Sequence, residues 1–176
     1  GCGSAFLAWM RSGMGETMGG RLESLVASRD RQERAGNIQE GSGKNVRAKD
    51  DTPMRGDDEP SALEMARTIA VARLVLGAPM SIQAPPNLSP GVYPRLIGAG
   101  LNDWGGVSPV TPDHVNPEAP WPNIDELARP SAEMGKRPVH RPPDHPRYAR
   151  VADPWPPARP ATPRRQRRAA RGLAHR

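Results

Sequence analysis

The residues with the clearest chemical capacity lie in or directly after two short stretches, 80–84 and 102–108. Amide and carboxylate groups there can hydrogen-bond a polar ring or hydroxyl groups, and an indole can stack on an aromatic ring. The candidates for substrate binding are Gln83, Asn87, Asp103, Trp104 and Ser108. The alternative is a scaffolding role, with Asn87 in an Asx-turn and Trp104 packed as core.

Charged residues follow two other stretches of the chain. Glu16 ends a Gly-Met-Gly-Glu turn, and Arg47 and Lys49 follow the stretch 37–46. Guanidinium and ammonium groups bind carboxylates well, so Arg47 and Lys49 are candidates for holding the carboxylate of a cofactor or polar substrate. Solvated loop charges are the alternative, and Glu16 is also a residue that a helix N-terminus favours.

The histidines give weaker signals. His114 and Asn116, in a Thr-Pro-Asp-His-Val-Asn loop, are candidates for proton transfer or substrate binding. His140, Asp144 and His145 superficially suggest a metal site. They lie in a Pro- and Arg-rich stretch with no predicted element to orient them, so we expect no metal there.

Strands and helices must alternate to position these loops. The predicted strands are 8–12, 37–46, 80–84 and 102–108, and the predicted helices are 17–35, 62–76, 90–99 and 124–134. Polar loops follow the strands. This order predicts an α/β fold, a partial (β/α) TIM-type barrel whose chemistry lies on the loops after the strands.

Three helices carry sequence signals of their own. Ser61 and Glu64 form a capping box before the helix 62–76, and Gly77 is a good C-terminal stop. Ser89 before Pro90 predicts the start of the helix 90–99. The predicted packing faces are Leu22, Leu25, Val26 and Arg29 in the helix 17–35, and Leu63, Ala66, Ile69, Ala70, Arg73 and Leu76 in the helix 62–76.

Some residues oppose the elements that contain them. Arg11 and Ser12 are expected to break the strand 8–12. The run 41–44, Gly-Ser-Gly-Lys, is depleted in strands and is expected to bury almost nothing. Pro130 is expected to break the helix 124–134.

Length and charge divide the chain. At 176 residues it holds one domain at most, because a complete eight-unit barrel takes roughly 250 residues. The net charge of +6 is unevenly distributed along the chain. Residues 137–176 contain eleven Arg and two Asp, whereas residues 1–136 are slightly acidic. We therefore expect a C-terminal fragment of a barrel over 1–136, which also fits a start at Gly1, and a disordered or degraded Arg/Pro-rich tail over 137–176.

The cysteine count and the lengths of the apolar runs exclude several classes of protein. Cys2 is the only cysteine, so one chain holds neither an internal disulfide nor a cysteine-ligated metal centre. No apolar run approaches the roughly 18 residues that span a membrane, and the stretch 5–10 is too short for a signal-peptide core. We expect a cytoplasmic protein.

Three runs of sequence resemble one enzyme family. They are Ile82-Gln-Ala-Pro-Pro-Asn-Leu88, Asn102-Asp-Trp-Gly-Gly-Val-Ser-Pro109, and Thr111-Pro-Asp-His-Val-Asn-Pro-Glu-Ala-Pro-Trp-Pro122. The chain resembles the first subunit or half of the FO synthase family (7,8-didemethyl-8-hydroxy-5-deazariboflavin synthase), which are radical S-adenosylmethionine enzymes. The resemblance is nearly continuous from Gly13 to about Ala128.

The resemblance implies a lyase of deazaflavin coenzyme biosynthesis. The family forms the deazariboflavin chromophore from 5-amino-5-(4-hydroxybenzyl)-6-(D-ribitylimino)-5,6-dihydrouracil and S-adenosylmethionine. It uses a [4Fe-4S] cluster held by a Cys-x3-Cys-x2-Cys loop, which this sequence lacks. The resemblance therefore implies that the chain is inactive alone, with the N-terminal half or the second FO synthase subunit as its partner.

Two alternatives from other classes remain open at this point. One is a non-catalytic relic that folds poorly, which the run 41–44 and Pro130 favour. The other is a basic nucleic-acid-binding protein that acts through the Arg-rich tail, including Arg164-Arg-Gln-Arg-Arg168. No aromatic platform or recognisable nucleic-acid module accompanies that tail, so it is the less favoured of the two.

Overall fold

Three parallel strands form the centre of the fold. The computed structural model describes residues 6–12, 16–108 and 110–140, which lie within one compact unit. The strands β1 (Phe6–Ser12), β2 (Ile38–Asn45) and β3 (Ser81–Gln83) form a sheet in the order β1-β2-β3. Both strand pairs are parallel. The predicted α/β class is confirmed as a mixed fold around a small parallel sheet.

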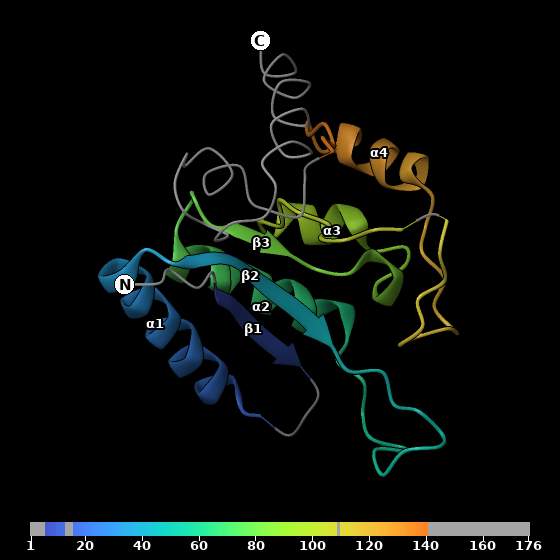
Figure 1. Cartoon of the computed structure of the whole chain (residues 1–176), viewed down its shortest axis with the longest axis horizontal. Helices are drawn as coiled ribbons and strands as arrows, with labels where there is room; N and C mark the ends of the chain where they lie inside the picture. Colours follow the sequence, from blue (N-terminus) through green and yellow to red (C-terminus); the bar gives the residue numbers. More distant parts are fainter. Residues whose placement is uncertain (1–5, 13–15, 109, 141–176) are drawn as a thin grey trace, which may run out of the picture. The chain divides into compact units, whose positions relative to one another are not determined.

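Two helices connect the strands and cover one face of the sheet (Figure 1). They are α1 (Met18–Ala35), between β1 and β2, and α2 (Ala62–Leu76), between β2 and β3. The core lies between this helical layer and the sheet, around the fully buried Ile69, Ala72 and Ile82. Two shorter helices follow, α3 (Tyr93–Gly98) and α4 (Ile124–Glu133).

The helix predictions over 17–35 and 62–76 are confirmed by α1 and α2. N-terminal capping residues explain where each of these helices begins. Thr17 accepts a hydrogen bond from the Gly20 amide, 3.1 Å away, at the start of α1. The capping box between Ser61 and Glu64 is complete at the start of α2. The predicted packing face of α2 is wrong at Leu63, which is 48% exposed; Met65, Thr68 and Ala72 are buried instead.

The strand β2 forms through the run that was expected to oppose it. Gly41, Ser42 and Gly43 are all buried. A Cβ on Gly43 would lie 3.8 Å from Ile69 and from Met65, so α2 packs directly against this backbone. The poor strand propensity of the run is overridden by this packing, because strand preference depends on context.

The strand β1 also continues where a break was expected. Arg11 pairs with Lys44 and Ser12 with Asn45 in the parallel ladder. A polar residue can occupy the end of a strand as long as its backbone pairs with a neighbour. The expectation that Arg11 and Ser12 break the strand is therefore wrong.

The segment after β3 departs from the prediction in two places. The predicted start of a helix at Pro90 is wrong: a short 3-10 helix (Pro86–Leu88) comes first, and α3 begins at Tyr93. Gly91, with φ of 76°, has a left-handed backbone that no α-helix contains. The predicted strand 102–108 is reduced to one bridge between Asp103 and Gln83.

The helix α4 runs through Pro130 without a break. Proline lacks one backbone N–H, but the turn after it is complete because the Met134 amide donates to the Pro130 carbonyl at 3.3 Å. The Ser131 hydroxyl adds a bond of 2.6 Å to the Leu127 carbonyl. The expected break is therefore wrong, although the lost bond still costs stability.

The predictions for the tail fall mostly outside the described residues. Asp144, His145 and the Arg-rich run 164–168 all lie there, as does Cys2. His140, at the end of the described part, is exposed.

Candidate functional site

The carboxyl ends of parallel strands meet at one edge of a sheet, and the predicted site residues follow those ends. Glu16 comes after β1, Arg47 and Lys49 after β2, and Asn87 after β3. Asp103 follows α3 and pairs with β3. Hydrogen bonds join some of these loops and bring the predicted residues into two groups, while the other predicted residues lie apart from both.

The first group lies on a polar strip of β2 and β3. The Gln83 side-chain amide donates to the Glu40 carboxylate at 2.9 Å, and the Ser81 hydroxyl donates to the Asp103 carboxylate at 3.0 Å. Gln83 and Asp103 were predicted from the sequence, whereas Glu40 and Ser81 were missed. The signal for them was the period of two along each strand, because residues two apart lie on the same face.

A glycine fixes the position of Gln83. A Cβ on Gly105 would lie 2.6 Å from the Gln83 Oε1 atom, so a larger residue there would require the end of the Gln83 side chain to move. Gly105 also has φ of 69°, and its amide donates to the Asp103 Oδ1 atom at 2.7 Å. The backbone therefore approaches the polar strip closely, as expected of a glycine near a ligand site.

The second group ties the loop after β2 to its neighbours. The Arg47 guanidinium contacts the Glu59 carboxylate at 2.7 Å and the Leu88 carbonyl at 3.0 Å. Lys49 donates to the Val115 carbonyl and lies 3.9 Å from the Glu118 carboxylate. A ligand carboxylate must therefore compete with these partners for either cation.

Asn87 and Asn116 belong to the same group and meet at Asp113. The Asn87 side-chain amide donates to the Asp113 Oδ2 atom at 2.8 Å and to the Ala119 carbonyl at 3.0 Å. Asp113 also accepts bonds from the amides of Val115 and Asn116 and from the Asn116 side chain. Asp113 was missed by sequence reasoning; its signal was an aspartate followed by a turn that its own side chain can close.

The Asp113 carboxylate is held in its charged form. Burial acts against the charge, but the hydrogen bonds from the Asn116 side chain, the two backbone amides and Asn87 outweigh it. Together they lower the pKa of Asp113 from 3.8 to about 2. Asp113 is thus an ionised centre that fixes the loop of residues 111–119 against the loop after β3.

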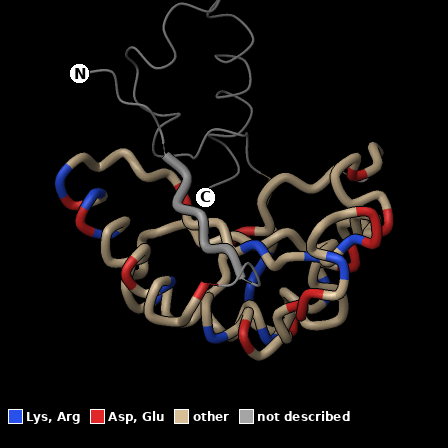
Figure 2. Tube along the Cα trace, turned by 90° about the horizontal axis from the view of Figure 1, so that it is seen from below, with Lys and Arg blue, Asp and Glu red and all other residues tan. Residues whose placement is uncertain are grey.

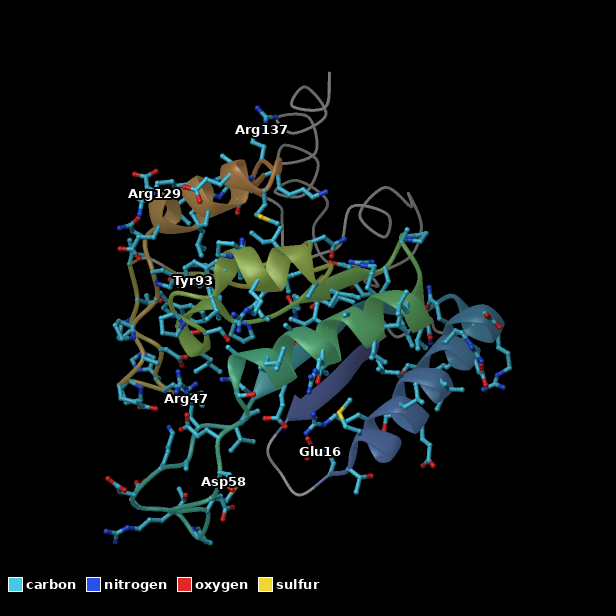
Figure 3. All side chains as sticks on the ribbon, turned by 180° about the vertical axis from the view of Figure 1, so that it is seen from behind. Glu16, Arg47, Asp58, Tyr93, Arg129 and Arg137 are labelled. Atoms are coloured by element: carbon cyan, nitrogen blue, oxygen red, sulfur yellow. The ribbon has the colours of Figure 1, made fainter. Side chains whose placement is uncertain are left out.

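The remaining predicted residues stand apart. Trp104 forms an edge-to-face contact with Tyr93, with 5.2 Å between ring centroids, and packs against the core. The Ser108 hydroxyl lies 2.6 Å from the Thr111 hydroxyl, and His114 is exposed. Glu16 accepts a bond of 3.1 Å from Arg21 and lies away from Arg47 and Tyr93 (Figure 3).

A cavity of about 630 Å³ opens beside the second group. Arg47, Asn87 and Tyr93 line it together with the segment 118–123. The Tyr93 hydroxyl donates to the Pro86 carbonyl at 3.3 Å. Burial, and to a lesser degree the negative charge of Glu126, raise the pKa of Tyr93.

The described residues do not fit an iron–sulfur cluster. No group of three His, Cys, Asp or Glu side chains in that part of the chain could hold a metal ion. The whole sequence contains a single cysteine, whereas a cluster takes several thiolates. None of the helices over the described residues is long and apolar enough to cross a membrane.

The small parallel sheet with helices between its strands places the chain in the α/β class of proteins. Curated relatives narrow the class. A protein named FO synthase from Nocardia farcinica is 51% identical over 144 residues, covering 81% of this chain and 17% of the relative. FO synthase from Mycobacterium tuberculosis is 48% identical over 151 residues, covering 85% of this chain and 18% of the relative.

A shorter relative agrees with these two. The 7,8-didemethyl-8-hydroxy-5-deazariboflavin synthase of Methanopyrus kandleri is 45% identical over 138 residues, covering 78% of this chain and 41% of the relative. The chain is a homologue of the FO synthases over less than half of their length, and the resemblance read from its sequence is confirmed. No family model matches the chain. No solved structure matches it significantly.

Proposed function

We propose that the chain serves the FO synthase reaction of deazaflavin biosynthesis as a substrate-binding part of a radical S-adenosylmethionine lyase. The observation that carries the proposal is the identity of 44–51% with proteins of that name over most of this chain. In the proposal, β1 to β3 are units of a partial (β/α) barrel spanning residues 1–136. Residues 137–176 are a separate tail.

The polar strip is the part of the site that the geometry supports best for substrate. Gln83 and Asp103 present amide and carboxylate groups on the sheet, where they can hydrogen-bond a dihydrouracil ring or ribityl hydroxyls. Asn87 and Asn116 hold the loop beside it, and Trp104, Ser108 and His114 complete the proposed substrate residues. Catalytic residues are left unassigned.

Glu16, Arg47 and Lys49 are the proposed contacts for S-adenosylmethionine. Arg47 and Lys49 carry this role only if the ligand carboxylate replaces Glu59 and Glu118, their present partners. The cluster must come from cysteines other than those of one copy of this chain, so no radical step is assigned to its residues.

The test is a chimera of the Nocardia farcinica relative in which the matched residues are replaced by those of this chain. We expect it to form the deazaflavin product from the dihydrouracil substrate and S-adenosylmethionine, within about tenfold of the parent rate. The measurement is product mass by liquid chromatography and mass spectrometry. A folded chimera that binds the cluster but forms no product rejects the proposal.

A matched pair of glycine variants tests the polar strip within that chimera. Gly105→Ala should displace Gln83 and lower product formation by about tenfold to a hundredfold. Gly56→Ala is the control, because Gly56 also has a positive φ, of 83°, and nothing lies within 4 Å of a Cβ at that position. Equal activity of the two variants would remove Gln83 from the proposed site.

A further inference from the structure

The cavity beside Tyr93 has a lining that the proposed reaction does not explain. Flat apolar surface comes from two aromatic rings and several prolines: Tyr93, Trp121, Pro90, Pro120 and Pro122. Such surface suits a planar apolar ligand, and a volume of about 630 Å³ lies within the usual range of small-molecule sites.

The charges of the lining favour a cation. Of the three carboxylates in the lining, Glu59 pairs with Arg47 and Glu118 lies 3.9 Å from the Lys49 ammonium. The third carboxylate, that of Glu126, is the one that a ligand cation would meet. Glu59 and the Leu88 carbonyl already engage Arg47, so an anion must first break these bonds. Among the described residues Glu126 has no ion-pair partner; it accepts a neutral hydrogen bond of 3.0 Å from the Asn123 side chain.

Asn87, in the same lining, is held in place by hydrogen bonds of its own. Asn87 is 4% exposed, and both bonds of its side-chain nitrogen are made, to Asp113 and to Ala119. Its Oδ1 atom is buried and has no hydrogen-bond partner among the described residues. Because this oxygen has almost no accessible surface, a ligand in the cavity meets it only if the Asn87 side chain moves, and the charge of Glu126 is the stronger argument for a cation.

We propose that this cavity binds a flat organic cation. Its ammonium or amidinium group meets the Glu126 carboxylate and supplies N–H donors, and its ring lies against Trp121 and the prolines. Charge-assisted hydrogen bonds and the attraction of a cation to an indole both add to the affinity. The cavity shares Arg47 and Asn87 with the proposed reaction, but the cation site goes beyond that reaction because Glu126, Trp121 and Tyr93 have no part in it.

The test is calorimetric titration of the full chain at low salt with three probes of one shape: benzamidine, benzamide and benzoate. We expect benzamidine to bind with a dissociation constant of about 1 mM or tighter, and the two other probes to bind at least about tenfold more weakly. Equal binding of neutral benzamide, stronger binding of benzoate, or no binding of benzamidine would each overturn the proposal.

Variants then locate the site. Glu126→Gln should weaken benzamidine binding about tenfold, and Trp121→Leu should weaken it by a similar factor. Asp125→Asn is the matched control, because Asp125 lies in the same first turn of α4 and does not line the cavity. Thermal unfolding of each variant checks that it folds, and a shift of the Trp121 indole NMR signal in the parent gives a second measure.

If benzamidine binds the parent but neither Glu126→Gln nor Trp121→Leu weakens it, the cavity is excluded as the binding site. No step of the FO synthase reaction enters these measurements. Failure of the cation site and failure of the proposed function are therefore separate results.

Discussion

At the scale of single residues, the side chains expected to meet a ligand already hold the loops together. Arg47 joins the loop after β2 to the Leu88 carbonyl in the loop after β3, and Asn87 joins that same loop after β3 to Asp113. The sequence identified Arg47 and Asn87 from their types and their places after strands. It did not identify their partners, because hydrogen bonds between residues 26 to 41 positions apart depend on the folded geometry.

Asp113→Asn tests the ionised centre of this network. The pKa of Asp113 is lowered from 3.8 to about 2, so its stabilising contribution is fully present above 3.8 and is lost as the pH falls toward 2. We expect the variant to be less stable than the parent by about 1 kcal/mol near neutral pH, after allowance for solvent screening. The difference should vanish by about pH 2.

The measurement is urea unfolding of both proteins across this pH range. Asp125→Asn is the control, an exposed carboxylate on α4 outside the network. A stability difference for Asp113→Asn that stays constant down to pH 2 would contradict the proposed role of its charge.

At the scale of elements, local signals were sufficient for α1 and α2 and insufficient for α3, α4 and the strands. Caps at Thr17 and Ser61 fixed the starts of α1 and α2 within the sequence itself. Strand β2 depends on β1 and α2 for its pairing and packing, which no local pattern in 41–44 records. At 102–108 the sequence predicted a strand that does not form, because its residues pair with a neighbouring strand at only one bridge. This error also arises because strand pairing depends on the folded structure and not on the local sequence.

Pro130 gives a prediction at this scale. An interior proline costs a helix about 3 kcal/mol, whereas a proline in the first turn costs little. Pro130→Ala should therefore stabilise the protein by about 1–3 kcal/mol, and Pro94→Ala, in the first turn of α3, should leave stability nearly unchanged. Denaturant unfolding measures both, and a gain from Pro94→Ala as large as that from Pro130→Ala would contradict the argument.

At the scale of the whole molecule, one arginine joins three segments. The Arg73 guanidinium on α2 donates to the carbonyls of Gly77, Met80 and Gly100, with distances of 2.7 to 2.8 Å for the shortest bond to each. Burial lowers the pKa of Arg73. The sequence placed Arg73 on the packing face of its helix but gave no sign of these carbonyl partners.

Arg73→Leu should destabilise the protein by about 2–4 kcal/mol, because the carbonyls that it caps lose a charged donor. Arg67→Leu is the control: Arg67 lies on the same helix and is exposed. The free energy of unfolding in denaturant measures both. Similar losses for the two variants would show that Arg73 contributes only as an ordinary surface charge.

The distribution of charged residues in the described part of the chain tests the nucleic-acid-binding alternative. Basic and acidic positions are interspersed along its trace (Figure 2). A nucleic-acid interface typically carries its Lys and Arg residues clustered together, whereas the coloured trace of the described residues alternates between the two signs of charge. The nucleic-acid alternative would depend on the Arg-rich tail, which lies outside the described residues.

The small residues of β2 set the spacing between the two layers of the fold. At Gly43 the Gln83 carbonyl would lie 3.5 Å from an added Cβ, which leaves room for one methyl group and no more. A bulkier side chain would push α2 outward, and a helix moves largely as a rigid rod. Arg73 lies near the C-terminal end of α2, so an outward shift of α2 at Gly43 would also move Arg73. The size of the residue at position 43 therefore affects the hydrogen bonds from Arg73 to the carbonyls near β3.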